Sequence, residues 1–303
     1  KLSSRQKDVL ALLILAVFFI LPLRGLLRAQ GPPMEEGFML VFPERLLEGD
    51  IPNKDFLHLY GPGSIWAIAG FFQAFGISLW TERVFGFLQL VALIGGVTHI
   101  GYRWGRWTAT LAGATTAIII IPPIGVTALA WVGGMALALW AVIWAVRPLD
   151  EGHTGRRTLL VAGLLAGAAL LFRPDLVVAL GLSLAVVFLF AYDGPQRRTL
   201  LLGGAVGVSP FLLHMAFAGP ANAVRGMVLE PVFDLRPGRT LPFPPPTDSF
   251  PSFLNRAYAL RDFPWPFPEA SMTMQVALFF WALVLVCLSL LVMAVLAKRA
   301  GSP

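Results

Sequence analysis

Long apolar runs separated by short basic turns dominate the sequence. A membrane-spanning helix needs roughly 17–25 predominantly apolar residues, so the pattern predicts an all-α polytopic membrane protein of about eight transmembrane helices. The first run is too long for a signal peptide and no small-residue cleavage site follows it, so we expect it to be retained. The expected spans are 9–27, 83–102, 107–122, 126–146, 158–172, 175–192, 199–217 and 273–297.

Basic residues gather in alternate turns between these runs. If the N-terminus is inside, the cytoplasmic segments hold twelve Lys and Arg against four Asp and Glu. Loops with excess Lys and Arg face the cytoplasm. The pattern therefore predicts a multi-pass protein of the cell inner (plasma) membrane with both termini cytoplasmic. The segments in question are 1–8, 103–106, 147–157, 193–198 and 298–303.

The apolar segment 62–76 is too short for a confident span, and counting it would place the Arg-rich turns outside. We expect it to form a helix in the outer membrane interface. A single transmembrane domain over 1–303 then has two large outer segments, 28–82 with interfacial helices and 219–272. The Pro-rich run 241–253 cannot be helical, because proline lacks the amide donor and clashes with the preceding turn.

Composition supports a lipid environment. Of the 303 residues, 57% are hydrophobic and 13% are charged, and the mean hydropathy is +0.74. A soluble chain of this size could not present enough polar surface. The net charge of +6 is explained by orientation in the membrane, so we expect membrane lipids and no nucleic acid as partners. With one cysteine and four scattered histidines, we expect no disulfide, metal site or cofactor.

Acidic residues are most frequent in the first outer segment. Carboxylates at a membrane face commonly mark functional sites. Glu35 and Glu36 follow two prolines and open a short amphipathic helical pattern that ends at Gly49. The alternative is that the two acids only stabilise the positive end of that helix.

The run EEGFMLVFPERLLEGDIPNKDFLHLYGPG resembles the first outer loop of GT-C-class glycosyltransferases, which include protein O-mannosyltransferases and aminoarabinose transferases. The shared features occur in one order: an acidic pair before Gly and Phe, an RLLEG run followed by Pro52 and Asp55, and an HLYGPG turn that begins at His58. The fold of that class has a core of about seven spans, so the resemblance can accommodate nearly the whole chain.

The resemblance implies a membrane glycosyltransferase. Such an enzyme moves a sugar from a polyprenyl-phosphate-linked donor to a hydroxyl of a lipid, glycan or protein acceptor at the outer membrane face. Glu35, at the first acidic position, would take the proton of that hydroxyl. The family usually has Asp there, so Glu36 is an alternative base. Asp55, His58 and Tyr60 lie in the matching run and are expected to contact substrate.

A lipid-phosphate leaving group requires cationic side chains, and arginine offers paired donors to phosphate oxygens. The candidates are Arg173, at the outer end of a span with Asp175 as its ion partner, and Arg236 and Arg239 in the second outer segment. The alternative for each is a snorkelling or solvated arginine without a ligand.

The sequence departs from the family at one place. Some relatives carry a second Asp in the outer turn between the third and fourth spans, whereas here that turn holds no acid and Gly133 or Gly134 occupies the nearest position. A second acid, if needed, would come from Asp55 or Asp175.

Two other functions fit part of the pattern. A transporter or flippase of lipid-linked intermediates could also use paired acids and a basic outer cavity, and a membrane-embedded assembly subunit would need neither for chemistry. Transport sites usually place a charged residue near the middle of a span. The expected spans have none there.

Overall fold

The computed structural model describes residues 3–28, 31–151 and 155–234. The chain divides into the unit Lys1–Asp234 and the unit Leu235–Pro303, and only the first contains described residues. Within them the regular structure is helical, with one isolated bridge between Pro52 and Phe56. The helices are α1 (Ser4–Leu26), α2 (Pro33–Glu48), α3 (Gly63–Phe75), α4 (Leu79–Gly101), η1 (Tyr102–Trp104), α5 (Arg106–Ile124), α6 (Ala130–Glu151), α7 (Arg156–Phe172), α8 (Leu176–Phe190), α9 (Gly194–Val208), α10 (Pro210–Ala218), α11 (Pro220–Val224) and the π-helix η2 (Arg225–Asp234).

The predicted all-α membrane class is confirmed. In chain order, the first seven expected spans fall on α1, α4, α5, α6, α7, α8 and the consecutive pair α9 and α10. Three helical stretches are long and apolar enough to cross a membrane, namely Leu79–Trp104, Ala130–Pro148 and Gly194–Ala218. The expected number of about eight spans is therefore not confirmed. The expected span 273–297 lies outside the described residues, as does the second outer segment beyond residue 234.

Local capping signals set several helix ends. The side chain of Ser3 accepts a hydrogen bond from the Gln6 amide, and the Gln6 side chain accepts one from the Ser3 amide. Asp193 and Gln196 repeat this capping box at the start of α9. Helix α2 ends at Gly49, whose φ of 106° is the left-handed conformation that closes a helix. These side chains satisfy backbone groups that a helix end would otherwise leave unpaired.

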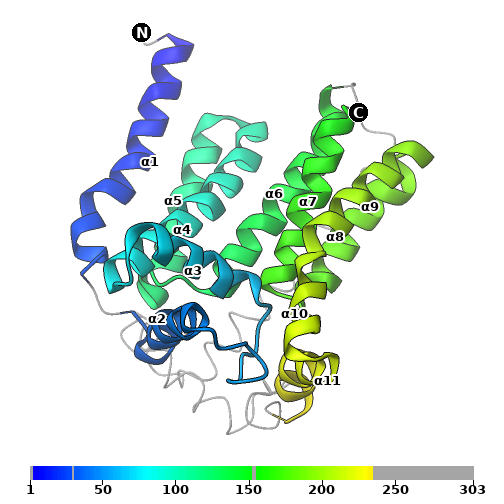
Figure 1. The fold of residues 1–303 in the computed structure, drawn as a ribbon. Helices are drawn as coiled ribbons and strands as arrows, with labels where there is room; N and C mark the ends of the chain where they lie inside the picture. The colour runs from blue at the N-terminus through cyan, green and yellow to red at the C-terminus, as the bar shows by residue number, and fades with distance from the viewer. Residues whose placement is uncertain (1–2, 29–30, 152–154, 235–303) are drawn as a thin grey trace, which may run out of the picture. The chain divides into compact units, whose positions relative to one another are not determined.

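The longer helices form a row. Contacts place them in the order α1, α5, α4, α6, α7 and α9, with α8 against α6 and α7 (Figure 1). The centre of the row is apolar, since Leu90 and Ile94 of α4 pack with Ile121 of α5 and Val132 of α6. Many other apolar side chains on these helices are exposed, as expected for surfaces that face lipid.

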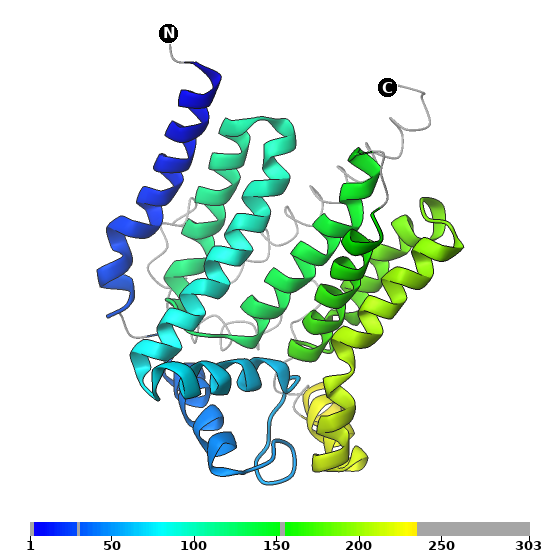
Figure 2. The same cartoon turned by 45° about the horizontal axis from the view of Figure 1, so that its top comes forward.

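Helices α2 and α3 cross the ends of the longer helices instead of extending the row (Figure 2). They pack on each other through Met39, Ile68 and Phe72, which form a buried cluster with Ala128 of the α5–α6 loop. The helix expected over 62–76 is thus present as α3, and its place in a membrane interface stays a prediction. This end of the unit gathers α2, the loop 50–62, the α7–α8 turn and α10, and it contains the candidate site.

Candidate active site

The first turn of α2 holds the two predicted catalytic acids. Proline occupies the first helical position, where its missing amide proton is not needed, and Glu35 and Glu36 lie at the positive end of the helix dipole. Consecutive helical residues point about 100° apart. Glu36 is accordingly buried, whereas Glu35 is half-buried. One acid of the pair faces the protein interior and the other a more open environment.

Glu36 is held by a buried ion pair. Its Oε1 accepts a hydrogen bond of 2.7 Å from Arg83 Nε, and its Oε2 accepts one of 3.3 Å from the Gly31 amide. The same arginine donates from Nη1 to the Leu27 carbonyl at 2.7 Å. The side chains of Arg83 and Glu36 are only 8% and 9% exposed. Both oxygens of Glu36 are therefore occupied by protein donors.

Glu82 joins this buried cluster, and the sequence did not point to it as a site residue. It is completely buried, and its Oε1 accepts a 2.7 Å hydrogen bond from the Ala128 amide. Its Oε2 has no partner in the described part of the chain. The carboxylates of Glu36 and Glu82 repel each other, and Arg83 attracts both. In the sequence, Glu82 and Arg83 look like an ordinary charged start to a span. No sequence signal marks them as site residues, because only tertiary packing shows that the start of α4 is buried.

The loop between α2 and α3 is organised by Asn53. Its Nδ2 donates to the His58 carbonyl at 2.6 Å, and its Oδ1 lies 2.9 Å from Nε2 of His214 on α10. Asn53 has a φ of 66°, a left-handed conformation that asparagine tolerates better than most residues. The loop is thereby tied to a helix 161 positions away in sequence.

His58 is buried in the same loop and acts there as a neutral hydrogen-bonding group. Its Nε2 lies 3.3 Å from the Gly61 carbonyl oxygen. Its ring packs in T-shaped arrangements against the rings of Phe42 and Tyr60, at centroid distances of 5.9 and 5.8 Å. Burial lowers the pKa of His58 to about 4. The part of the chain that is described contains no group of three His, Cys, Asp or Glu residues able to hold a metal ion.

The HLYGPG turn rests directly on the end of α7. The Gly61 amide donates to the Phe172 carbonyl at 3.1 Å. A Cβ atom at Gly61 would lie within 3.0 Å of the Leu171 carbonyl oxygen, so a side chain there would push the turn away. This close approach explains a glycine at that position.

Arg173 follows α7 and lies beside Tyr60. Its Nε and Nη2 bind the two oxygens of Asp175 at 2.8 and 2.6 Å, and its guanidinium carbon is 4.8 Å from the centroid of the Tyr60 ring. The hydrogen bonds to Asp175 are the main cause of a raised pKa of Arg173, and the charge of Glu35 adds to it. The same pair lowers the pKa of Asp175. The structure thus places Glu35, Tyr60 and Asp175 within electrostatic range of Arg173.

The position where some relatives have a second acid faces this group. A Cβ atom at Gly134 would lie 3.0 Å from Cγ and 3.2 Å from Cβ of Arg173. The glycine therefore leaves room for the arginine stem, and the acid that partners Arg173 comes from Asp175 in the next turn.

Asp55 has a different environment. Its Oδ2 accepts a 2.7 Å hydrogen bond from the Ile51 amide, and its carbonyl accepts one from Arg45 Nη2 at 3.3 Å. It borders a polar cavity of about 370 Å³ on the other side of the loop, together with Asn53, Lys54, Phe56, Leu57, Asn222, Arg225, Gly226 and Glu230. The structure does not show Asp55 among the groups around Arg173. Arg236 and Arg239 lie outside the described residues.

An apolar groove of about 550 Å³ starts at the helix end beside this site. It is lined by α4, α6 and α7, and Phe172, which precedes Arg173, forms part of its wall. Gln89 is its main polar residue, 7% exposed and with both amide atoms unpartnered in the described residues. The remaining lining consists of Phe85, Leu88, Ala92, Gly133, Ala136, Leu137, Trp140, Trp144, Val161 and Leu165.

Comparison with known proteins supports the fold assignment. The sequence matches no protein-family model and no curated protein. The structure is similar to the crystal structure of ArnT from Cupriavidus metallidurans bound to undecaprenyl phosphate, with a TM-score of 0.56 and 17% sequence identity. The similarity covers 92% of this chain and 55% of that one, so the chain spans little more than half the length of ArnT. The likeness shows that the chain shares its fold with part of ArnT.

Proposed function

We propose that the protein is a membrane glycosyltransferase that moves a sugar from a polyprenyl-phosphate donor to an acceptor hydroxyl, with Glu35 as the general base. One observation carries this proposal: hydrogen bonds from Arg83 and from the Gly31 amide occupy both carboxylate oxygens of Glu36. Glu35 is then the acid of the pair whose charge acts on Arg173 and whose oxygens remain available within the described residues. A catalytic base needs an oxygen that is not already committed to protein donors.

Arg173 is the proposed contact for the donor phosphate. Asp175 occupies Nε and Nη2, and Nη1 makes no hydrogen bond to another described residue. Charge-assisted hydrogen bonds from a guanidinium stabilise the negative charge that develops on a departing phosphate. Asp175 holds the arginine in place, and the Tyr60 ring supports its flat face.

The groove beside Phe172 gives the lipid chain of the donor a place to lie. Its walls are almost entirely apolar, and they include Phe172, the residue that precedes Arg173. A polyprenyl chain in this groove would bring its phosphate to Arg173. That ArnT is bound to undecaprenyl phosphate supports a donor of this class for the present fold.

The proposed step is a single displacement. The proton of the acceptor hydroxyl passes to an oxygen of Glu35, and the acceptor oxygen bonds to the anomeric carbon. The bond from that carbon to the phosphate oxygen breaks, and its electron pair leaves with the polyprenyl phosphate. The donor, the acceptor (a lipid, glycan or protein), the inner-membrane location and the cytoplasmic termini are all parts of this proposal.

A sugar-transfer assay with Glu35→Gln and Glu36→Gln tests the assignment. Undecaprenyl-phosphate-linked sugars would be screened as donors with the wild-type protein first. We expect Glu35→Gln to lower the transfer rate by about 10²–10⁴-fold without changing the thermal unfolding midpoint. Glu36→Gln should lower that midpoint, because it leaves Arg83 without its carboxylate. Full transfer by Glu35→Gln would exclude Glu35 as the base, whereas absence of transfer by the wild type with every donor would favour a transporter or flippase.

A further inference from the structure

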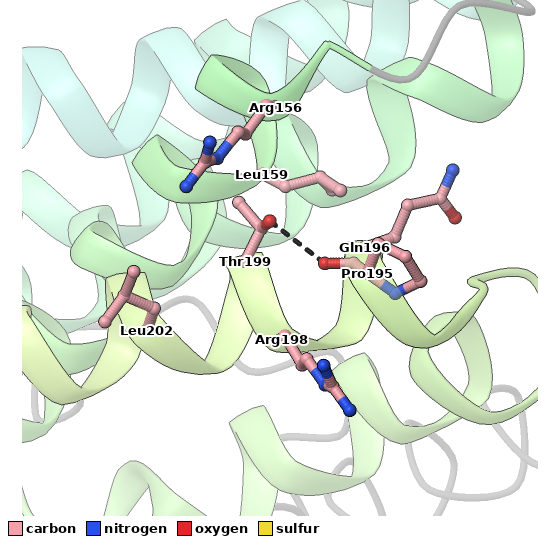
Figure 3. Close-up of a pocket in the computed structure, with 7 residues that line it drawn as sticks. All are labelled: Arg156, Leu159, Pro195, Gln196, Arg198, Thr199 and Leu202. Carbon is pink, nitrogen blue, oxygen red and sulfur yellow. Dashed lines mark hydrogen bonds between the residues drawn. The ribbon is translucent and has the colours of Figure 1, made fainter.

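A second cavity lies at the far end of α7 from Arg173. It has a volume of about 430 Å³ and is bordered by the first turns of α7 and α9 (Figure 3). Helix α7 has 17 residues and therefore separates the two places by about 25 Å. The residues that line the cavity are Arg156, Leu159, Pro195, Gln196, Arg198, Thr199 and Leu202.

The two arginines of this cavity have no partner among the residues that the structure describes. Neither Arg156 nor Arg198 makes a hydrogen bond or an ion pair with another residue in the described part of the chain, and both side chains are exposed. Five other arginines of the unit are paired with acids. Those pairs are Arg45–Asp50, Arg83–Glu36, Arg106–Asp8, Arg173–Asp175 and Arg225–Glu230. The cavity is thus bordered by two arginines that form no ion pair within the described residues.

The positive end of α7 adds to this charge, whereas the start of α9 is already capped by the carboxylate of Asp193. Gly163 of α7 meets the Leu200 carbonyl of α9, and one turn later Gly167 meets the Gly204 carbonyl, so the two helices run in the same direction. Both therefore begin at the cavity. The N-cap of α7 is Gly155, which provides no side-chain acceptor for the first amides of the helix. Helix N-termini with free amides favour an anion.

Apolar side chains continue from the cavity along the outside of the same helices. Leu202 lines the cavity and is 52% exposed, and Val206 follows it by four residues on α9 with 51% exposed. On α7, Leu160 and Leu164 follow Arg156 at the same spacing and are also exposed. A ligand with a charged head and a hydrocarbon tail would match both parts of this surface.

We propose that this cavity binds a phosphate ester group, as carried by the head of an anionic phospholipid. The guanidiniums of Arg156 and Arg198, which point in different directions in Figure 3, would turn toward the cavity and bind the phosphate oxygens together with the first amides of α7. The sequence predicts this end of α7 to be cytoplasmic, and basic pockets between helices on that side bind anionic lipid heads. The site is separate from the proposed transfer reaction, and it would exist even if Glu35 had no catalytic role.

Binding of dioctanoyl phosphatidylglycerol to the purified protein in a non-ionic detergent tests this proposal. We expect saturable binding that weakens at least tenfold in the double variant Arg156→Gln/Arg198→Gln. The matched control is Arg157→Gln, because Arg157 is exposed in the same helical turn but does not line the cavity. Its dissociation constant should stay within twofold of the wild-type value. Unfolding midpoints measured without lipid would verify that the variants are folded. The single variants Arg156→Lys and Arg198→Lys keep the positive charge, so each should bind the lipid more tightly than the corresponding Gln variant.

Two further arms identify the source of the phosphate. Competition by millimolar inorganic phosphate would assign the cavity to a free phosphate anion, whereas unchanged lipid binding would assign it to a lipid head. Either result retains a phosphate site. Absence of saturable binding of both ligands, or an equal loss of binding in Arg157→Gln, would overturn the proposal.

Discussion

Glu35 and Glu36 are neighbours in sequence with different surroundings. Consecutive side chains on a helix point in different directions, so the side chain of Glu36 enters the protein interior, where Arg83 and the Gly31 amide bind it. Glu35 remains half-buried and acts electrostatically on Arg173. Glu36 is therefore committed to a structural ion pair, and Glu35 is the acid of the pair to which we assign the proposed chemistry.

Loss of the buried arginine should destabilise the protein strongly. Arg83→Gln leaves Glu36 buried without its charge partner, and we expect it to lower the free energy of unfolding by about 3–5 kcal/mol. The control is Arg45→Gln. It breaks the half-exposed pair with Asp50 and should cost about 1 kcal/mol or less. Denaturant unfolding in detergent would measure both, and equal losses would contradict the structural role of the buried pair.

His58 should make stability depend on pH. Burial lowers its pKa to about 4 in the folded state, against about 6.5 when unfolded. The unfolded state then binds more protons between these values, so stability is greatest above pH 6.5 and falls as the pH decreases toward 4. The loss amounts to about 3 kcal/mol at most.

The comparison for this effect is His58→Gln, which cannot become charged in that pH range. Its unfolding midpoint should decrease less than that of the wild type between pH 7 and pH 5. Parallel midpoints for the two proteins would show that another group causes the pH dependence.

Several candidate site residues were predicted from the sequence because they lie in one contiguous run. The acidic pair and the HLYGPG turn resemble the first outer loop of GT-C-class glycosyltransferases, and Arg173 stood out as an arginine at a span end. Which acid is buried could not be predicted, because that depends on Arg83 at a separation of 47 positions. Glu82 was missed for the same reason, since only tertiary packing shows that the start of α4 is buried.

At the scale of helices, close packing of α7 against α9 depends on glycine. A Cβ atom at Gly163, Gly203 or Gly207 would lie within 3.0 Å of a backbone carbonyl oxygen of the partner helix. Small residues at such a spacing let two helix backbones approach closely in a membrane protein. This packing holds the two helix N-termini of the second cavity together.

Gly163→Ala should therefore destabilise the protein by about 1–3 kcal/mol, because the added methyl group has no space. Gly204→Ala is the matched control on the facing helix. Its Cβ atom would lie 3.8 Å from the nearest atom, the Gly163 carbonyl oxygen, so its effect should be small. Thermal unfolding of both variants would measure the difference. A larger loss in Gly204→Ala would show that the helices pack differently.

The apolar pattern predicted most helices and missed some boundaries. The expected span 199–217 consists of two helices, α9 and α10, that meet at Ser209 and Pro210. Hydropathy is continuous across this point, whereas proline lacks an amide proton and tends to begin a new helix. A hydropathy pattern does not record such an interruption.

For the whole molecule, the fold brings segments from distant parts of the chain to one end. The loop after α2 is tied to α10 through Asn53 and His214, and to the end of α7 through Gly61. The described unit brings together the proposed base, the arginine proposed to bind phosphate and an apolar groove. The similarity to ArnT shows the fold, and the proposed use of a lipid-phosphate donor depends on this arrangement.

Binding of undecaprenyl monophosphate to the purified protein is the most direct test of the proposed lipid-phosphate site at Arg173. We expect saturable binding that Arg173→Gln weakens at least tenfold. Arg225→Gln should not change it, because that arginine is 70% exposed, pairs with Glu230 and borders a different cavity. The double variant Arg156→Gln/Arg198→Gln should retain the component of binding that depends on Arg173, which separates the two proposed phosphate sites. Absence of binding by the wild type, or undiminished binding by Arg173→Gln, would contradict a lipid-phosphate site at the end of α7.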